Sequence, residues 1–505
     1  MSSVRELPRI IQGGMGVAVS DWRLARAVAE LGGLGVVSGT ALDTVLIRRL
    51  QLGDEGGHIR RALDAFAFPA LASRVIADYF VEGGVERGRP FRLTTLPNEH
   101  PTFRREALHV IAAFVEVYLA KNGHSGQVGM NLLEKIQLPT LPSLFGAMLA
   151  GVDVVLMGAG IPLAIPGVLD AFSRLEAAEI RLQVEGNALG RVFTSRFDPA
   201  AFLGKCREGE AGFTARAGEP TSLPRPSFIA IVSSHILAKT LHKKASGKVD
   251  GFVVEGHVAG GHNAPPRKKR SQTDDASSPY GAADEPELAP LRELGVPFWL
   301  AGSFASAGKV HEAIERGARG VQVGTVFAYC DESGIAADIK RRVIASCRAG
   351  TLRVETDFEA SPTGYPFKVL LDDQRPVELE QLRARERLCD LGYLRQAYVN
   401  DRGQLAFRCP GEQVETYLKK GGSVEATKNK LCLCNGLLAT VGLGQRRISV
   451  DELPILTAGE GVREILAYLS PGKDSYSARD VVTILHSVVA FADSDVTRRQ
   501  ARAQG

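Results

Sequence analysis

Three short stretches decide the fold of this chain: VDGFVVEGHVAGGH at residues 249–262, PFWLAGS at 297–303 and GVQVGT at 320–325. In each, an apolar run leads into glycine with a polar residue beside it. A strand that passes into glycine-rich backbone at its C-terminal end is how parallel α/β proteins present main-chain N–H groups to a phosphate. These stretches therefore predict parallel strands whose C-terminal ends carry the functional site.

The same alternation of short apolar runs and helical patterns continues towards both ends of the chain. A helix over 22–31, capped by Ser20 or Asp21, separates the first two runs, and right-handed crossovers make such strands parallel. Eight βα units predict an α/β protein with a TIM (β/α)8 barrel, rather than a doubly wound sheet, whose glycine fingerprint would come early in the chain. The predicted strands are 9–12, 34–38, 128–132, 152–157, 228–233, 251–255, 298–301 and 321–323.

Residues that interrupt the βα pattern are predicted to be additions to the barrel. The barrel is expected over 1–345, with insertions at about 41–125 and 180–227. The polar segment 263–286, which contains the basic run 267–270, is either a solvated loop or a mobile lid that attracts a phosphorylated cosubstrate. Residues 346–505 are expected to pack on the barrel as a C-terminal elaboration, with a last apolar helix over 478–491.

Composition narrows the class of protein. With 505 residues, 45% of them hydrophobic, the chain can bury a large core, and its net charge of +4 is too small for a nucleic-acid surface built on bulk electrostatics. No run approaches the roughly 18 apolar residues of a membrane helix, and the N-terminus lacks a signal-peptide core, so we expect a cytoplasmic protein.

The seven cysteines are an odd and sparse set, which indicates reduced thiols. Four of them lie in the C-terminal third and could ligate a metal, but their spacing matches no zinc finger, so we favour reduced buried thiols over a metal site. These four are Cys389, Cys409, Cys432 and Cys434.

Two neighbouring strand ends are suited to a phosphate. Gly302-Ser303 follows the seventh predicted strand and Gly324-Thr325 the eighth. Both turns can offer main-chain N–H groups, and these are the loops in which TIM barrels bind phosphate. The alternative is a pair of ordinary tight turns.

Other strand ends offer contacts for a flat heterocycle. Gly13 and Gly14 let a ring lie against backbone, and Met15 adds an adaptable apolar contact. The amide of Asn131 can bond a ring carbonyl and imino group, although it could equally be a turn residue. Glu255 would be a costly buried charge without a partner, so it is a site residue or half of an ion pair.

Two histidines share the loop after the sixth strand. A histidine can give or take a proton near neutral pH. His262 follows Gly260 and Gly261, which allow close approach to a ligand, and we favour it over His257 as the catalytic residue. The alternative is a surface turn histidine.

Taken together, these motifs resemble the FMN-binding barrel of the nitronate monooxygenases, also called the 2-nitropropane dioxygenase-like family, which includes FMN-dependent enoyl-acyl-carrier-protein reductases. The matching motifs are QGGM at 12–15, GMN at 129–131, Glu255 followed by AGGH at 259–262, AGS at 301–303 and QVGT at 322–325. The resemblance implies that Gly14 and Met15 lie behind a flavin and that Asn131 contacts its ring. It also implies a phosphate held by Gly302, Ser303, Gly324 and Thr325, with Gln322 nearby, and His262 beside the active site.

Two departures bear on the substrate. Well-characterised bacterial nitronate monooxygenases carry a catalytic histidine just after strand four, where this chain reads MGAGIP at 157–162, which is similar to the enoyl reductase branch. Ser303 replaces a glycine common in the phosphate loop.

The sequence thus predicts an FMN-dependent oxidoreductase in which electrons pass through flavin N5 to or from a small organic substrate. One alternative is an enoyl-thioester reductase that uses NAD(P)H as cosubstrate and an acyl thioester as substrate. Another is a flavin- or phosphate-binding protein without turnover. The sequence is compatible with a homodimer.

Overall fold

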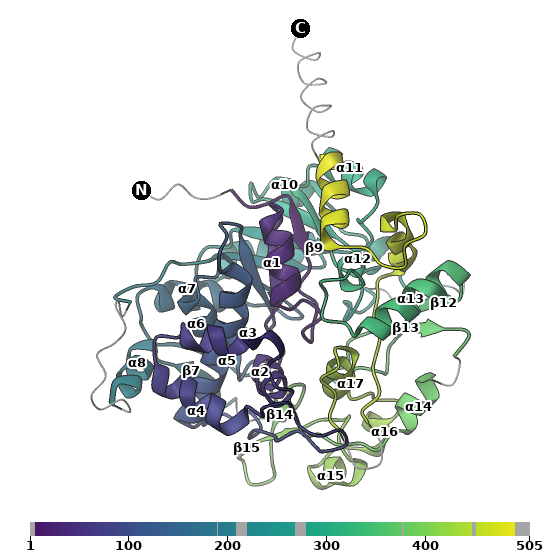
Figure 1. Cartoon of the computed structure of the whole chain (residues 1–505). Helices are drawn as coiled ribbons and strands as arrows, with labels where there is room; N and C mark the ends of the chain where they lie inside the picture. Colours follow the sequence, from purple (N-terminus) through teal and green to yellow (C-terminus); the bar gives the residue numbers. More distant parts are fainter. Residues whose placement is uncertain are drawn as a thin grey trace.

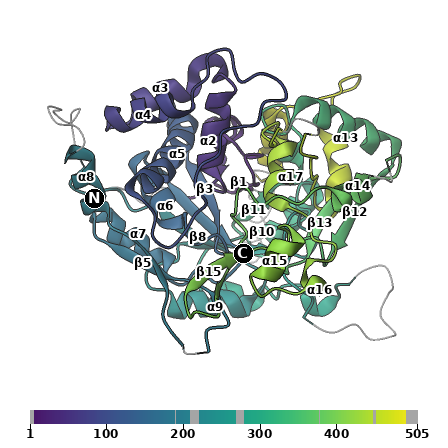
Figure 2. The ribbon, with the colours of Figure 1, turned by 90° about the horizontal axis from the view of Figure 1, so that it is seen from below.

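The computed structural model describes residues 6–188, 190–208, 220–267, 279–375, 378–446 and 451–489. Its central feature is a sheet of eight parallel strands in the order β1-β11-β10-β9-β8-β4-β3-β2 (Figure 2). A parallel bridge between Ile11 and Leu34 joins the two ends of this order, with the Gln12 N–H donating to the Leu34 carbonyl at 3.0 Å. The predicted TIM barrel is therefore confirmed. The strands are β1 (Ile10–Gln12), β2 (Gly35–Ser38), β3 (Val128–Leu133), β4 (Val154–Gly158), β8 (Ser227–Val232), β9 (Gly251–Glu255), β10 (Phe298–Ala301) and β11 (Gly320–Val323).

The strands are apolar on both faces because each face is covered. Inside the barrel, Ile11, Leu156, Val253 and Trp299 belong to one buried cluster. The outward-facing residues join a larger cluster between the strands and the surrounding helices. Parallel strands buried on both sides read as continuous hydrophobic runs, which is why they could be recognised in the sequence.

Helices surround the barrel in the expected alternation (Figures 1 and 2). The carboxylate of Asp21 caps α1 by accepting from two main-chain N–H groups, and the hydroxyl of Ser234 caps α9. The long helix α5 lies between β2 and β3 in the chain and packs against α1 and α6. These helices are α1 (Trp22–Glu30), α5 (Phe103–Lys121), α6 (Thr140–Leu149), α7 (Ile165–Ser173), α9 (His235–Lys244), α10 (Ala289–Arg292), α11 (Ala307–Glu315), α12 (Thr325–Ala328) and α13 (Ala337–Ala349).

Two groups of elements lie between regular barrel units. The first, between β2 and α5, consists of α2 (Leu42–Gln51), η1 (Glu55–Gly57), α3 (His58–Asp64) and α4 (Pro69–Tyr79). The second follows α7 and consists of β5 (Ala178–Arg181), β6 (Val184–Glu185), β7 (Thr194–Phe197) and α8 (Pro199–Glu208). Of the predicted lid, residues 268–278 lie outside the described residues, and the part after them contains η2 (Ala282–Asp284).

The C-terminal third runs alongside the barrel (Figure 1). Its β12 and β13 form an antiparallel hairpin, while β14 pairs with β15 and also with β6 of the second group. It has a small apolar cluster of its own, which includes Phe367, Leu431 and Ile455, and residues 456–489 join the barrel cluster. The elements are β12 (Leu352–Asp357), β13 (Phe367–Asp372), α14 (Glu378–Ala384), β14 (Gln396–Val399), β15 (Leu405–Arg408), α15 (Val414–Lys419), α16 (Val424–Thr427), α17 (Leu433–Thr440) and η3 (Glu460–Tyr468).

A last helical stretch covers residues 478–489, and the rest of the predicted final helix lies outside the described residues. In the part of the chain that the structure describes, no helix is both long and apolar enough to cross a membrane.

Candidate active site

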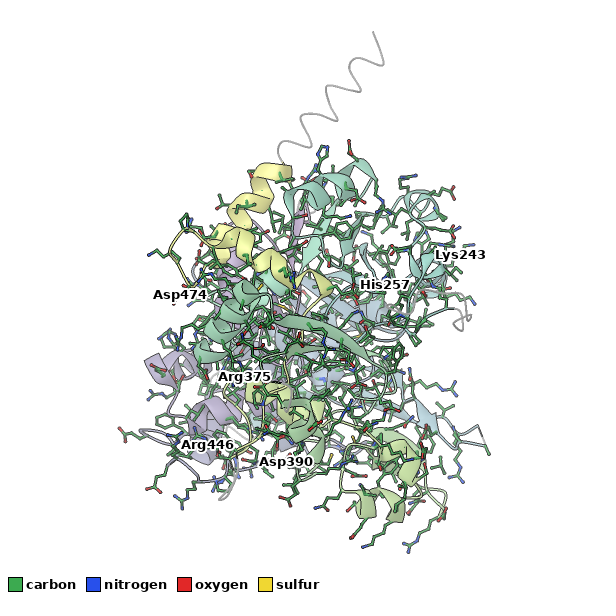
Figure 3. The ribbon with its side chains drawn as sticks, turned by 90° about the vertical axis from the view of Figure 1, so that its right-hand side faces the viewer. Lys243, His257, Arg375, Asp390, Arg446 and Asp474 are labelled. Carbon is green, nitrogen blue, oxygen red and sulfur yellow. The ribbon has the colours of Figure 1, made fainter. Side chains whose placement is uncertain are left out.

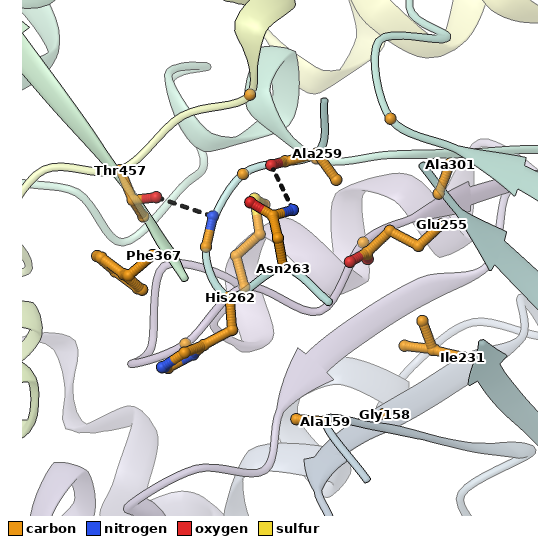
Figure 4. Close-up of a pocket in the computed structure, with 18 of the residues that line it drawn as sticks. Gly158, Ala159, Ile231, Glu255, Ala259, His262, Asn263, Ala301, Phe367 and Thr457 are labelled. Carbon is orange, nitrogen blue, oxygen red and sulfur yellow. Dashed lines mark hydrogen bonds between the residues drawn. The ribbon is translucent and has the colours of Figure 1, made fainter. Parts of the chain in front are cut away.

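A cavity of about 600 Å³ opens at the C-terminal ends of the barrel strands (Figure 4). This volume is within the usual range of cofactor and substrate sites, roughly 300–1,000 Å³. All thirteen residues predicted from the sequence as catalytic or cofactor-binding line this one cavity. They are Gly13, Gly14, Met15, Asn131, Glu255, Gly260, Gly261, His262, Gly302, Ser303, Gln322, Gly324 and Thr325.

The end of β1 is packed so closely that only glycine fits at position 14. A Cβ atom there would lie 2.2 Å from the Cβ of Asn131. The side-chain N–H of Asn131 donates to the Gly14 carbonyl at 2.9 Å, which fixes the orientation of the amide. Backbone and amide therefore form one flat wall of the cavity.

Two amide oxygens in this wall are buried and have no hydrogen-bond partner among the described residues. They are Oδ1 of Asn131 and Oε1 of Gln322. A buried acceptor without a partner is costly, at about 1–3 kcal/mol. Since both residues line the cavity, a ligand that donates N–H or O–H groups would remove this cost.

The two turns predicted to hold a phosphate lie side by side, because β10 pairs with β11. Gly302 has φ +99° and Ser303 has φ +54°, so the serine occupies a left-handed conformation that favours glycine. The Ser303 hydroxyl accepts from the Gly461 N–H at 3.1 Å, and the Thr325 hydroxyl accepts from the Gly459 N–H at 2.9 Å. Each hydroxyl keeps its own proton for donation to a ligand.

Glu255, at the end of β9, carries the most unusual carboxyl group in the cavity. Burial raises its pKa from 4.5 to about 7. Part of the side chain borders the cavity and is accessible there. Among the described residues no basic side chain contributes to this pKa shift, which speaks against the structural ion pair considered above. At neutral pH this group can exist with or without its proton, as a general acid or base requires.

His262 is held between the barrel and the C-terminal third. Its Nε2 lies 2.7 Å from the Ser361 hydroxyl, and its ring meets the edge of Phe367 at a centroid distance of 5.0 Å. Burial lowers the pKa of His262 to about 4, so the ring is neutral at pH 7. In Figure 4 the imidazole extends away from Glu255.

His257 also borders the cavity, but its ring makes other contacts. It stacks on Tyr280 at a centroid distance of 4.7 Å and lies 3.6 Å from the Glu285 carboxylate. Tyr280 in turn donates to the Ala264 carbonyl at 3.1 Å. Tyr280 thus connects the start and the end of the polar segment predicted as a lid, and His257 packs against the end of that segment.

The turn after β4 carries no ionisable side chain into the cavity. Gly158, Ala159, Gly160 and Ile161 line it there. In Figure 4 Gly158 and Ala159 lie below Glu255. Ala159 and Gly160 both have positive φ angles, of +55° and +156°. At this position, where well-characterised nitronate monooxygenases carry a histidine, the turn presents backbone and apolar surface to the cavity.

One wall of the cavity was not predicted from the sequence. Thr457, Ala458, Gly459 and Gly461 line it, and the Thr457 hydroxyl accepts from the Gly261 N–H at 2.9 Å. A Cβ atom on Gly260 would lie 2.8 Å from Ala458. The glycine pair in TAGEG at 457–461 was the only signal in the sequence for this close approach.

Asn263 was also missed as a cavity residue. Its side-chain N–H donates to the Ala259 carbonyl at 3.1 Å, and its Oδ1 is buried with no partner in the part of the chain that the structure describes. It extends the AGGH motif by one residue, and an amide directly after that motif was a signal that could have been used.

Comparison with known proteins gives a family match over part of the chain. The nitronate monooxygenase family model matches residues 225–372, from β8 to β13, which confirms the resemblance seen in the motifs of that segment. Members of this family are oxidoreductases, so the match supports an oxidoreductase.

Solved structures similar to this chain include FabK from Thermotoga maritima, with 15% identity and a TM-score of 0.46 over 98% of this chain and 96% of that one. Nitroalkane oxidase from Streptomyces ansochromogenes has 16% identity and a TM-score of 0.41, with 97% of each chain covered. The enoyl reductase domain of MlnA, from the macrolactin biosynthesis cluster of Bacillus amyloliquefaciens, has 12% identity and a TM-score of 0.44, with 98% and 97% covered. A search among curated proteins found no match.

Proposed function

We propose that the protein is an FMN-dependent oxidoreductase that moves electrons to or from a small organic substrate. The observation that carries this proposal is the meeting of all thirteen predicted residues around one cavity at the strand ends. Sequence positions as far apart as Gly13 and Thr325 were selected by their motifs alone. The barrel brings every strand end to one rim, and here that rim surrounds a cavity of cofactor size lined by glycine turns, hydroxyls and amide side chains.

The cavity fits the groups of FMN. The main-chain N–H groups of the turns at 302–303 and 324–325, with the two hydroxyls, would hold the phosphate. The unpaired amide oxygens of Asn131 and Gln322 would accept from the ring or the ribityl hydroxyls. Gly14 leaves a flat surface for the ring. Bound FMN supplies hydride and electron transfer, while the protein supplies orientation and proton transfer.

Two residues share the acid–base work in this proposal. Glu255, with its pKa near 7, holds a proton that can be given or taken at neutral pH. His262 is neutral there and, fixed by Ser361, acts through hydrogen bonding. His262 remains our candidate catalytic residue, with Glu255 as the group that stores the proton.

Flavin binding is the first test. Purified protein, before and after incubation with FMN, should show a flavin absorption spectrum and quenched flavin fluorescence. The substitution Gly14→Ala should abolish binding, because its Cβ would displace Asn131. Gly308→Ala, where a Cβ meets nothing within 4 Å, is the matched control. Protein that takes up no FMN would contradict the proposal.

Enoyl-thioester reduction is the second candidate, and the turn after β4 favours it. That turn offers no histidine to act on a nitroalkane, and its positive φ angles leave backbone facing the cavity. Anaerobic mixing separates the two chemistries. Rapid bleaching of the flavin by NAD(P)H favours the reductase, whereas bleaching only by a nitronate or another organic donor favours the monooxygenase. No bleaching by any donor would favour a binding protein without turnover.

A further inference from the structure

Four cysteines that are scattered in the sequence meet at one place in the C-terminal third. Together they line a small cavity of about 10 Å³. They come from three parts of the chain: one follows α14, one follows β15, and two lie at the start of α17. All four are free thiols in the structure. They are Cys389, Cys409, Cys432 and Cys434.

A side-chain amide reaches the sulfur atoms of this cluster. The Nδ2 group of Asn435, which lines the same cavity, donates to the Cys432 sulfur at 3.6 Å. Amide donors beside sulfur are how proteins stabilise and tune metal-bound thiolates.

Positive charge also gathers around these sulfur atoms. Arg385 interacts electrostatically with Cys432, and Arg395 with Cys389, Cys409 and Cys434. The Arg385 guanidinium is only 10% exposed and also pairs with Glu452 at 3.1 Å. Arg385 and Arg395 are well placed to balance the negative charge of several thiolates.

We propose that Cys389, Cys409, Cys432 and Cys434 ligate an iron–sulfur cluster of the [4Fe–4S] type. Four cysteine thiolates are the ligand set of such a cluster. The site is separate from the thirteen residues of the cofactor cavity, so this inference does not depend on the proposed function.

A single zinc ion is the alternative occupant of this site. Zinc draws four sulfur atoms to about 2.3 Å from itself. Among the described residues no group of three or more His, Cys, Asp or Glu side chains is arranged to hold a metal ion as it stands. In a cluster each cysteine binds a different iron, so the four ligands need not meet around one ion.

The cysteine site lies next to the large cavity of the barrel. Cys434 lines both the small cavity and the large one, and its neighbours Leu433 and Leu437 also border the large cavity. Asp390, next to Cys389 in the chain, lies in the lower part of Figure 3. The cluster would therefore share a wall with the proposed cofactor cavity. This position suits a redox role better than a purely structural one.

The test is the metal content of the full-length protein, purified without oxygen and, in a parallel sample, reconstituted with iron and sulfide. About four irons and four acid-labile sulfides per chain are expected, with an electron paramagnetic resonance signal after reduction by dithionite. Stoichiometric zinc, or no iron even after reconstitution, would overturn the proposal. Flavin is measured in the same samples: flavin without iron overturns the cluster alone, and iron without flavin contradicts the proposed function alone.

Substitutions locate the ligands. Cys389→Ser and Cys434→Ser should each lower the iron content by more than half. Cys347→Ser removes a buried thiol outside the site and should leave iron unchanged. An equal iron content in all three variants would overturn the assignment. Since the wild-type stoichiometry decides the question by itself, a poorly folding variant does not remove the test.

Discussion

The buried carboxyl of Glu255 should make the stability of the cofactor-free protein fall as the pH rises. In the unfolded chain this group loses its proton near pH 4.5, whereas in the folded protein it does so near pH 7. Between these values the folded state binds the proton that the unfolded state has lost, so stability decreases with pH and then levels off above pH 7. Glu255→Gln removes the titration while keeping size and polarity.

The magnitude follows from the pKa. Each pKa unit corresponds to about 1.4 kcal/mol, which gives at most about 3 kcal/mol for the full change. Because part of the side chain borders a cavity that admits water, screening reduces the effect, and we expect about 1–2 kcal/mol. The variant should match the wild type near pH 4.5, apart from a constant offset, and gain this amount by pH 8.

Urea unfolding provides the assay. The chain has only two tryptophans, Trp22 and Trp299, and both are buried in the barrel region, so their fluorescence follows barrel unfolding. The difference between variant and wild type is measured from pH 4.5 to pH 8. Glu293→Gln, at an exposed glutamate, is the control for the loss of one carboxyl group. A difference for Glu255→Gln that does not change with pH would refute the reasoning.

Three further outcomes are expected. His262→Gln should retain bound FMN but slow turnover, as measured by flavin content and kcat, and an unchanged rate would exclude His262 from catalysis. Burial lowers the His262 pKa to about 4, so wild-type stability should decline from about pH 6.5 downwards as the unfolded state takes up the proton first, and His262→Gln should lose this decline in acid unfolding curves. Thr457→Val removes the acceptor of the Gly261 N–H and should cost about 1–2 kcal/mol in urea unfolding while weakening FMN affinity; equal affinity would show that the loop needs no such anchor.

The barrel could be predicted because each of its strands has a local signal in the sequence. The predicted β9 and β10 coincide with those observed, since glycine or proline borders each run and both faces are apolar. The convergence of Gly13, Asn131 and Thr325 was predictable for a related reason. In a parallel barrel all strands end at one rim, so motifs at strand ends must meet.

The rest depends on contacts between distant parts of the chain. Thr457 and Gly261 are separated by 196 residues, and no local sequence pattern predicts the hydrogen bond between them. The low pKa of His262 likewise arises from burial beneath residues such as Phe367. The four cysteines looked like isolated thiols because their spacing follows no known motif. Their meeting is set by the path of the loops between α14 and α17.

The hydrogen bonds between the loop at Gly260–His262 and the C-terminal third also imply an order of assembly. The Lys368 N–H donates to the Gly261 carbonyl at 2.8 Å, and the Thr457 hydroxyl accepts from the Gly261 N–H at 2.9 Å. During synthesis the eight strands emerge well before residues 457–461, so a newly made barrel has an unfinished rim until these residues have followed it. A ligand that needs the complete rim can bind only after residues 457–461 have joined the barrel.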